Sequence, residues 1–112
     1  MRIRAIGVGI LAFLASAASH SAGWTGWGLI TEISQQPATG TADVLIVATL
    51  PNNPTSCTDK DRFLFDVTTG RDERTFSMLL AALAAGQEVR LFVTDGCPQW
   101  DMPKITGAYI RR

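Results

Sequence analysis

Alternating apolar and polar positions predict five short strands, and one change of period predicts a helix. Segment 29–34 is rich in β-branched residues, 42–49 is apolar on both faces, and 62–67 alternates well. Two more strands are predicted at 88–94 and 104–111, after a polar loop and a helix. Because 42–49 has no polar face, we expect it to be a central strand.

Between the third and fourth strands the apolar spacing becomes helical. One stripe lies at i, i+3, i+4 and i+7, at Phe76, Leu79, Leu80 and Leu83. Asp72 is the predicted N-cap and Gly86 the predicted C-terminal stop. Met78, Ala82 and Ala85 form a second apolar surface. This second surface is interpreted either as a subunit contact or as more of the core.

The predicted order is therefore strand, strand, strand, helix, strand, strand. A five-stranded antiparallel barrel with a helix after its third strand is the order of the OB-fold. An open α+β sandwich fits the same order. The barrel is favoured because closure removes the exposed edges of short strands. We expect a mainly β domain with one helix, built as an OB-fold-like five-stranded antiparallel barrel.

Residues 1–22 have the layout of a secretory signal peptide, with a positive start, an apolar run at 6–15 and small residues after it. The run is shorter than the ~20 residues that a membrane-spanning helix needs. The alternative is a buried N-terminal helix. Cleavage after Ala17 matches the A-x-A pattern. Cleavage after Ala22 is the alternative, and it would make Gly23 the first residue of the predicted domain, 23–112.

The two cysteines, Cys57 and Cys97, agree with export. An even pair in a small exported domain predicts one disulfide, which here ties two loops together beside the barrel. The alternative, two free thiols at a metal or redox site, is disfavoured because neither a CxxC motif nor a histidine near either cysteine is present. We expect a secreted or periplasmic protein that is not held in a membrane after signal cleavage.

Charge and motifs exclude several functions. Without Arg2 and Arg4, eight basic residues face ten acidic ones, a net charge of −2 and no basic footprint for nucleic acid. The only histidine, His20, lies in the predicted signal peptide, which removes triads of the Ser-His-Asp and Cys-His kinds. HExxH, P-loop and GxGxxG motifs are absent. We expect no enzyme activity, no cofactor and no metal.

Three aspartates invite a calcium interpretation, which the spacing does not support. Counted from Asp59, an EF-hand loop needs glycine at position six and glutamate at position twelve, where Leu64 and Gly70 stand. Asp61 and Asp66 are therefore interpreted, with Asp59, as solvated carboxylates. A hydrolase that uses these carboxylates alone is the weakest of the hypotheses.

The tryptophans carry the strongest indication of binding. Trp24, Trp27 and Trp100 all fall at strand ends or in loops. Exposed aromatic side chains stack on sugar rings and anchor protein partners. The alternative is that they cap the ends of the barrel core. We take these three residues as the candidate ligand-binding residues.

Four short segments resemble, in the same order, parts of the B subunits of subtilase cytotoxin and the typhoid-toxin group. They are Gly23-Trp-Thr-Gly26, Leu29–Ile33, Leu83–Leu91 and Trp100-Asp-Met-Pro103. The resemblance implies an OB-fold assembled into a ring of five, with the helices lining the centre and glycans bound outside. It also implies a separate A subunit that supplies any enzyme activity.

The chain departs from those subunits in two respects. Trp27-Gly28 directly follows the Trp-Thr-Gly segment, so the serine-containing insertion that helps those subunits hold sialic acid is missing. The cysteines are also placed differently. The resemblance therefore extends to the fold and not to the sugar site. A shorter group of small exported bacterial proteins of unassigned role resembles the chain as well.

Two functional hypotheses result. The first is a non-enzymatic exported binding module, similar to a toxin B subunit, whose ligand is a glycan or a protein surface. The second is a periplasmic inhibitor or interaction protein acting on another exported protein. The second would use the loop Pro51–Thr58, which Cys57 pins.

Overall fold

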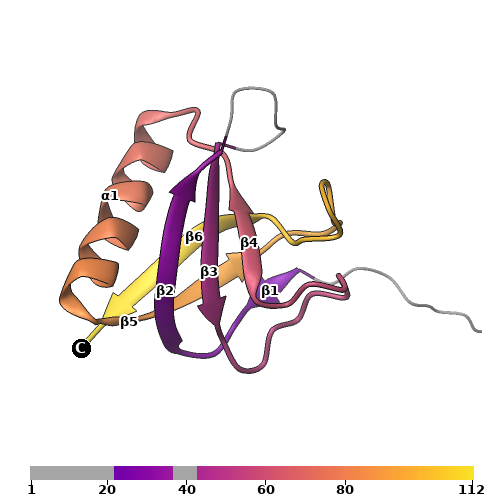
Figure 1. Cartoon of the computed structure of the whole chain (residues 1–112), viewed down its shortest axis with the longest axis horizontal. Coiled ribbons are helices and arrows are strands. Elements are labelled where there is room, and N and C mark those ends of the chain that lie inside the picture. Colours follow the sequence, from indigo (N-terminus) through magenta and orange to yellow (C-terminus); the bar gives the residue numbers. More distant parts are fainter. Residues whose placement is uncertain (1–21, 37–42) are drawn as a thin grey trace, which may run out of the picture.

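A computed structural model describes residues 22–36 and 43–112 as a β-rich domain with one helix (Figure 1). The predicted signal peptide, apart from Ala22, lies outside the described residues. The elements are β1 (Gly23–Trp24), β2 (Gly28–Gln35), β3 (Val44–Thr49), β4 (Arg62–Phe65), α1 (Gly70–Ala85), β5 (Glu88–Val93) and β6 (Ile105–Arg111). Five of these strands and the helix were predicted, in this order.

The strands form one antiparallel sheet that curves into a half-barrel. β2, β3 and β4 follow one another as neighbours, while β5 pairs with both β2 and β6. An isolated parallel bridge, Leu64↔Lys104, then links β4 to the start of β6. In this bridge the backbone N–H of Leu64 donates to the carbonyl oxygen of Pro103 at 2.8 Å. This circuit, with α1 between β4 and β5, confirms the OB-fold-like architecture.

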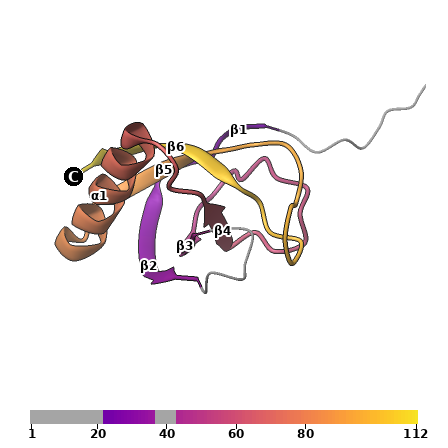
Figure 2. The same cartoon turned by 90° about the horizontal axis from the view of Figure 1, so that it is seen from above.

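The core lies inside the curve, with α1 against it. The predicted inward residues of β4 and β5 are fully buried, namely Phe63, Phe65, Val89, Leu91 and Val93. α1 packs on β2, β5 and β6, and seen from above it lies along one side of the sheet (Figure 2). Its Leu79 is completely buried. The hydrophobic alternation therefore places the core correctly.

β1 is an additional strand that the hydrophobic pattern did not predict. Its two residues pair antiparallel with the end of β5, with Gly23 opposite Val93 and Trp24 opposite Phe92. A strand of two residues is too short to produce a recognisable alternation. Its tertiary pairing is therefore the only evidence that it exists.

The N-cap of the helix lies three residues before the predicted one. Thr69 is the N-cap, and its hydroxyl accepts a hydrogen bond from the backbone N–H of Asp72 at 3.1 Å. Asp72 is the N3 residue, and its carboxylate completes a capping box by accepting from the N–H of Thr69 at 3.2 Å. Threonine and aspartate both occur often at the N-cap, and in this capping box each of them accepts a hydrogen bond from the backbone of the other. The predicted stop is confirmed, since Gly86 is the C-cap with φ of 65°.

The buried stripe of α1 differs by one position from the prediction. Leu80 is 43 % exposed, whereas Ala82 is 1 % exposed and belongs to the core. Ala82 lies about 60° around the helix from Leu79 and Leu80 about 100°, so Ala82 stays on the sheet side. The predicted second surface therefore loses Ala82, while Met78 and Ala85 remain exposed.

Candidate binding surfaces

Aromatic and arginine side chains gather on the outer face of β5 and β6, beside β1. We call this group, Trp24, Trp27, Arg90, Tyr109 and Arg111, the Arg90 patch. The sheet register places Arg90 directly opposite Tyr109 and Glu88 opposite Arg111. Because the side chains of cross-strand neighbours on one face lie about 5 Å apart, the register brings these groups together.

Ring contacts order the patch. The ring of Trp24 stacks on that of Tyr109, with centroids 4.5 Å apart, and meets Phe92 edge-on at 5.3 Å. The Arg90 guanidinium lies 5.0 Å from the Trp24 centroid, 5.5 Å from that of Tyr109 and 5.9 Å from that of Trp27. Cation–π attraction stabilises such an arrangement. The patch is therefore pre-arranged without any ligand.

The two arginines of the patch differ in their polar partners. Arg111 lies 4.2 Å from the Trp27 centroid, and its Nε donates to the Glu88 carboxylate at 2.9 Å. The Nε of Arg90 is buried and has no hydrogen-bond partner within the described residues. Tyr109 is 53 % exposed. The patch thus combines a half-open aromatic ring with a buried donor that is not satisfied.

The Trp-Thr-Gly segment joins β1 to β2 along β5. Thr25 is buried, its N–H donates to the carbonyl oxygen of Leu91 at 2.9 Å, and its hydroxyl accepts from the N–H of Leu91 at 3.1 Å. Gly26 donates to the carbonyl oxygen of Pro51 at 2.6 Å, and a Cβ there would lie 2.9 Å from the Pro51 ring. Thr25 and Gly26 therefore hold this part of the chain in place beside the Arg90 patch.

Trp100 lies at the tip of a separate turn. The backbone N–H of Met102 donates to the carbonyl oxygen of Gln99 at 3.0 Å, and the two central residues have positive φ, 52° at Trp100 and 54° at Asp101. Positive φ at both centres is typical of a type I′ turn, which favours Asn-Gly. For a residue with a Cβ atom, other than asparagine or aspartate, this conformation costs about 1 kcal/mol. Trp100 is nevertheless 62 % exposed.

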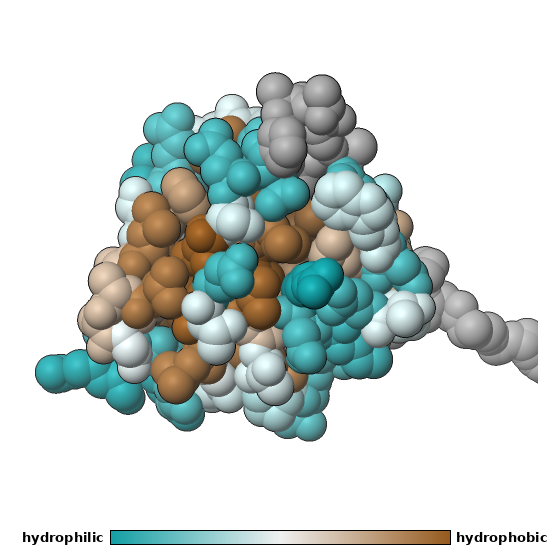
Figure 3. All heavy atoms as spheres, viewed as in Figure 1, coloured by the Kyte–Doolittle hydropathy of each residue, from teal (hydrophilic) through white to brown (hydrophobic). Residues whose placement is uncertain are grey.

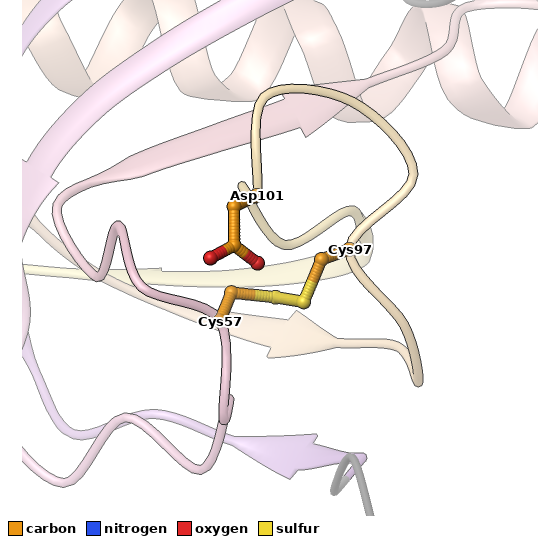
Figure 4. A group of neighbouring side chains, drawn as sticks. All are labelled: Cys57, Cys97 and Asp101. Carbon is orange, nitrogen blue, oxygen red and sulfur yellow. A yellow bond between two sulfur atoms is a disulfide. The ribbon is translucent and has the colours of Figure 1, made fainter.

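The predicted disulfide Cys57–Cys97 is present beside this turn, between the loop after β3 and the loop after β5 (Figure 4). The carboxylate of Asp101 accepts from the N–H of Thr58 at 3.1 Å, and its carbonyl oxygen accepts from the N–H of Asp59 at 3.2 Å. The two sulfurs and an Asp101 oxygen lie within 4.8 Å of one another. Bonded sulfurs are not thiolates, so this cluster is no metal site while the disulfide holds.

The loop at 94–104 folds over the outer face of β3 and β4. Leu64 points outward from β4 but is fully buried, and it packs with Met102 and Leu45 as a second small apolar cluster. In OB-folds, the outer face of the second and third barrel strands is the usual site for oligonucleotides and oligosaccharides. In this domain β3 and β4 hold that position, and the chain's own loop covers part of their outer face.

The structure separates the three predicted tryptophans. Trp24 and Trp27 share the Arg90 patch, where Trp24 packs on outward-facing residues instead of the barrel core. Trp100 forms no ring pair with either of them within the described residues. Residue-by-residue reasoning missed Arg90, Tyr109 and Arg111 as site residues. The alternation of β5 and β6 predicts that these side chains point outward, but only the strand register shows that they lie side by side.

Two of the three aspartates considered for calcium make contacts within the domain, and the third, Asp61, is exposed. Asp59 accepts from the N–H of Asp61 at 3.1 Å and lies 3.7 Å from the Nε of Arg62. Asp66 forms an ion pair with Lys104 at 2.5 Å. These contacts agree with their interpretation as solvated carboxylates.

A further apolar surface lies on the helix side of the domain. Figure 3 shows apolar side chains gathered over α1 and beside β2. The exposed large apolar residues of these two elements are Met78 and Leu80 on α1, each 43 % exposed, and Leu29 on β2, which is 49 % exposed. Exposed apolar surface of this kind marks contact surfaces in soluble proteins.

Comparisons with protein-family models, with curated proteins and with solved structures find no match. The resemblance to toxin B subunits stays a prediction. Within residues 22–36 and 43–112, no helix is long and apolar enough to cross a membrane. The disulfide indicates an environment outside the cytoplasm, where such bonds persist.

Proposed function

We propose that this protein is a non-enzymatic exported binding module that holds a glycan on the Arg90 patch. One observation carries the proposal: the half-exposed ring of Tyr109 lies 5.5 Å from the guanidinium of Arg90 on the outer face of the sheet. The apolar face of a sugar stacks on an aromatic ring, while its hydroxyl groups accept from guanidinium N–H groups. Glu88, opposite Arg111, adds an acceptor for a sugar hydroxyl.

The internal contacts of the patch favour binding. Trp24 and Trp27 are held by stacking and by the two arginines, so few side-chain rotations remain to be frozen when a ligand arrives. The role of the tryptophans in this proposal is thus to position Tyr109 and Arg90. Tyr109 itself makes the direct contact.

A glycan array followed by titration calorimetry tests this proposal. We expect Tyr109→Ala to weaken binding of the selected glycan by about 10-fold or more, the effect of losing a stacked ring. Trp100→Ala is the matched control, because it removes an exposed aromatic ring outside the patch, and it should bind as the unaltered protein does. An array without a binder, or a Tyr109→Ala variant with unchanged affinity, would remove the proposal.

The toxin resemblance adds a proposed assembly. In this proposal the protein forms a homo-oligomer, a ring of five, with α1 at the subunit contacts and an A subunit as partner. Met78 and Leu80 are both exposed, one on each flank of α1, where neighbouring subunits of a ring would meet. Light scattering of the unaltered protein and of Leu80→Glu should give an oligomer and a smaller species. A monomer in both cases would contradict the assembly and leave the glycan site untouched.

The exported location also remains a proposal in its details. It is supported by the predicted signal peptide at 1–22 and by the disulfide. N-terminal sequencing of the secreted or periplasmic protein should find a start after Ala17 or after Ala22. β1 begins at Gly23, so both cleavage points leave the described fold intact.

The second candidate function is a periplasmic inhibitor or interaction protein, and the loop between β3 and β4 favours it. Asn53 accepts from the N–H of Thr55 and donates to the carbonyl oxygen of Lys60, both at 3.0 Å. The N–H of Cys57 donates to the hydroxyl of Thr55 at 3.1 Å. A loop braced in this way presents a fixed shape to a protein partner.

A further inference from the structure

We propose that the turn Gln99–Met102, the Trp100 turn, is a second binding site, distinct from the Arg90 patch, whose indole inserts into an apolar pocket of another exported protein. This inference goes beyond the proposed glycan function, because it concerns a different ligand class and different residues. The first observation is that Trp100 occupies a backbone conformation that tryptophan does not favour. Trp100 has φ of 52° in a turn position that suits asparagine or glycine.

Packing within the domain does not explain this tryptophan. Trp100 is 62 % exposed, and within the described residues it forms neither a ring pair nor a cation–π contact. A buried tryptophan could offset the unfavourable φ through its contacts, whereas an exposed one cannot. A residue held in an unfavourable conformation without a structural gain indicates a function.

The turn is also held firmly in place. The disulfide of Cys97, two residues before it, ties it to Cys57, the Asp101 carboxylate accepts from the N–H of Thr58, and Met102, the last residue of the turn, is 4 % exposed. A side chain on a fixed turn loses little conformational freedom on binding. Tryptophan is among the residues that most often dominate protein–protein interfaces. The Trp100 turn therefore has the composition and rigidity of an interface anchor.

The surroundings define the partner's chemistry. The two disulfide-linked loops, 50–61 and 94–104, contain four aspartates and two lysines, and Lys104 is paired with Asp66 and Asp59 with Arg62, which leaves an excess of acidic groups. A partner pocket with apolar walls and a basic rim would match this surface. A protein fits better than a sugar, because a single ring on a protruding turn lacks the converging polar groups of a sugar site.

A stability measurement tests the first step. In Trp100→Asn the turn gains a residue that suits its φ, so the melting temperature should stay the same or rise by a few degrees. Trp24→Ala is the comparison, because its ring is packed and its loss should lower the melting temperature. A clear fall for Trp100→Asn would mean that Trp100 supports the fold, and the proposal would be overturned.

A binding measurement tests the second step. A photo-crosslinking amino acid at position 100, used in the producing cell, identifies the neighbour, and the same residue at position 80 on α1 is the control. The neighbour is then purified and titrated with the unaltered protein. We expect Trp100→Asn to weaken this affinity by about 30-fold, a hot-spot effect, and 0.5 M salt to weaken it further.

The remaining outcomes separate this proposal from the glycan site. Tyr109→Ala should leave the affinity for the protein partner unchanged, just as Trp100→Ala should leave glycan binding unchanged. Crosslinks only to a second copy of the chain, or crosslinks that appear equally from position 80, would overturn the proposal. So would a purified neighbour that binds Trp100→Asn as tightly as the unaltered protein.

Discussion

The two outer faces of this half-barrel differ in chemistry and in exposure. On β3 and β4 the outward residues include Leu45 and Leu64, and the loop at 94–104 covers them. On β5 and β6 the corresponding positions are Glu88, Arg90, Tyr109 and Arg111, and the face remains partly open. An apolar outer face must be covered, whereas a charged aromatic one can stay in water.

This difference bears on where the proposed ligand site lies. Covering Leu64 takes away part of the face on which OB-folds usually bind. The same covering loop, tied down by the disulfide, also raises Trp100 into solvent. In this interpretation the covered face serves stability and protein contact, while the open face serves the glycan.

Loss of the disulfide should have the largest effect, and it should act mainly on the covered face. The bond links residues 40 positions apart, and closing such a loop stabilises by about 4 kcal/mol in the chain-entropy model. We expect the Cys57→Ser/Cys97→Ser protein to lose about that much free energy of unfolding in urea. Without the bond, the loop over Leu64 should exchange its amide protons faster than the Arg90 patch does.

A reducing agent provides the control for this experiment. It should lower the stability of the unaltered protein and leave that of the double variant unchanged. Equal stability of the two proteins under oxidising conditions would contradict the structural role of the bond.

Removal of the Trp24 ring should have an intermediate effect, on the open face. Trp24 packs on Tyr109 and Phe92, and its truncation should cost about 2 kcal/mol, less than for a fully buried tryptophan. Chemical denaturation of Trp24→Ala measures this loss. Leu29→Ala, which shortens a side chain that is 49 % exposed, is the control and should change little. Equal effects of the two substitutions would mean that the stacked patch adds no stability.

The cap of α1, which belongs to neither face, should give the smallest effect, seen as a loss of stability in acid. The backbone N–H of Thr68 donates to the Asp72 carboxylate and is the main reason that its pKa lies below the ordinary value. A lowered folded pKa contributes stability above the unfolded pKa of about 4, and this contribution is lost as pH falls through the folded value. Stability should therefore decrease as the pH drops below about 4.

The Asp72→Asn variant tests this assignment. Its melting temperature should depend less on pH in that range than that of the unaltered protein. Asp95→Asn, which lies outside the helix, is the matched control. An acid dependence that is the same in all three proteins would show that other carboxylates govern it.

Much of the fold could be predicted because it depends on local periodicity. The alternation at Phe63, Phe65, Val89 and Leu91 identified inward positions, and Gly86 identified the helix end. The prediction of Asp72 as the N-cap was wrong because Thr69, three positions earlier, is an equally good capping residue. The order of elements indicated the OB-fold-like arrangement because few topologies bury so short a set of strands.

The candidate site could be predicted only in part. Trp24, Trp27 and Trp100 were identified by residue type, but which of them meet depends on strand register and loop path. Arg90 and Tyr109 lie nineteen positions apart in the chain and become neighbours only when β5 pairs with β6. A single sequence contains no direct record of that pairing.

The sequence by itself determined the strand and helix order, the inward residues and the one disulfide, since each depends on spacing or on the count of cysteines. The tertiary structure decided that β1 joins β5, that the loop at 94–104 covers Leu64, and that Arg90 lies among three aromatic rings. The physical reason is distance along the chain. Periodicity reports which side of an element is apolar, whereas only the folded sheet determines which distant side chains touch.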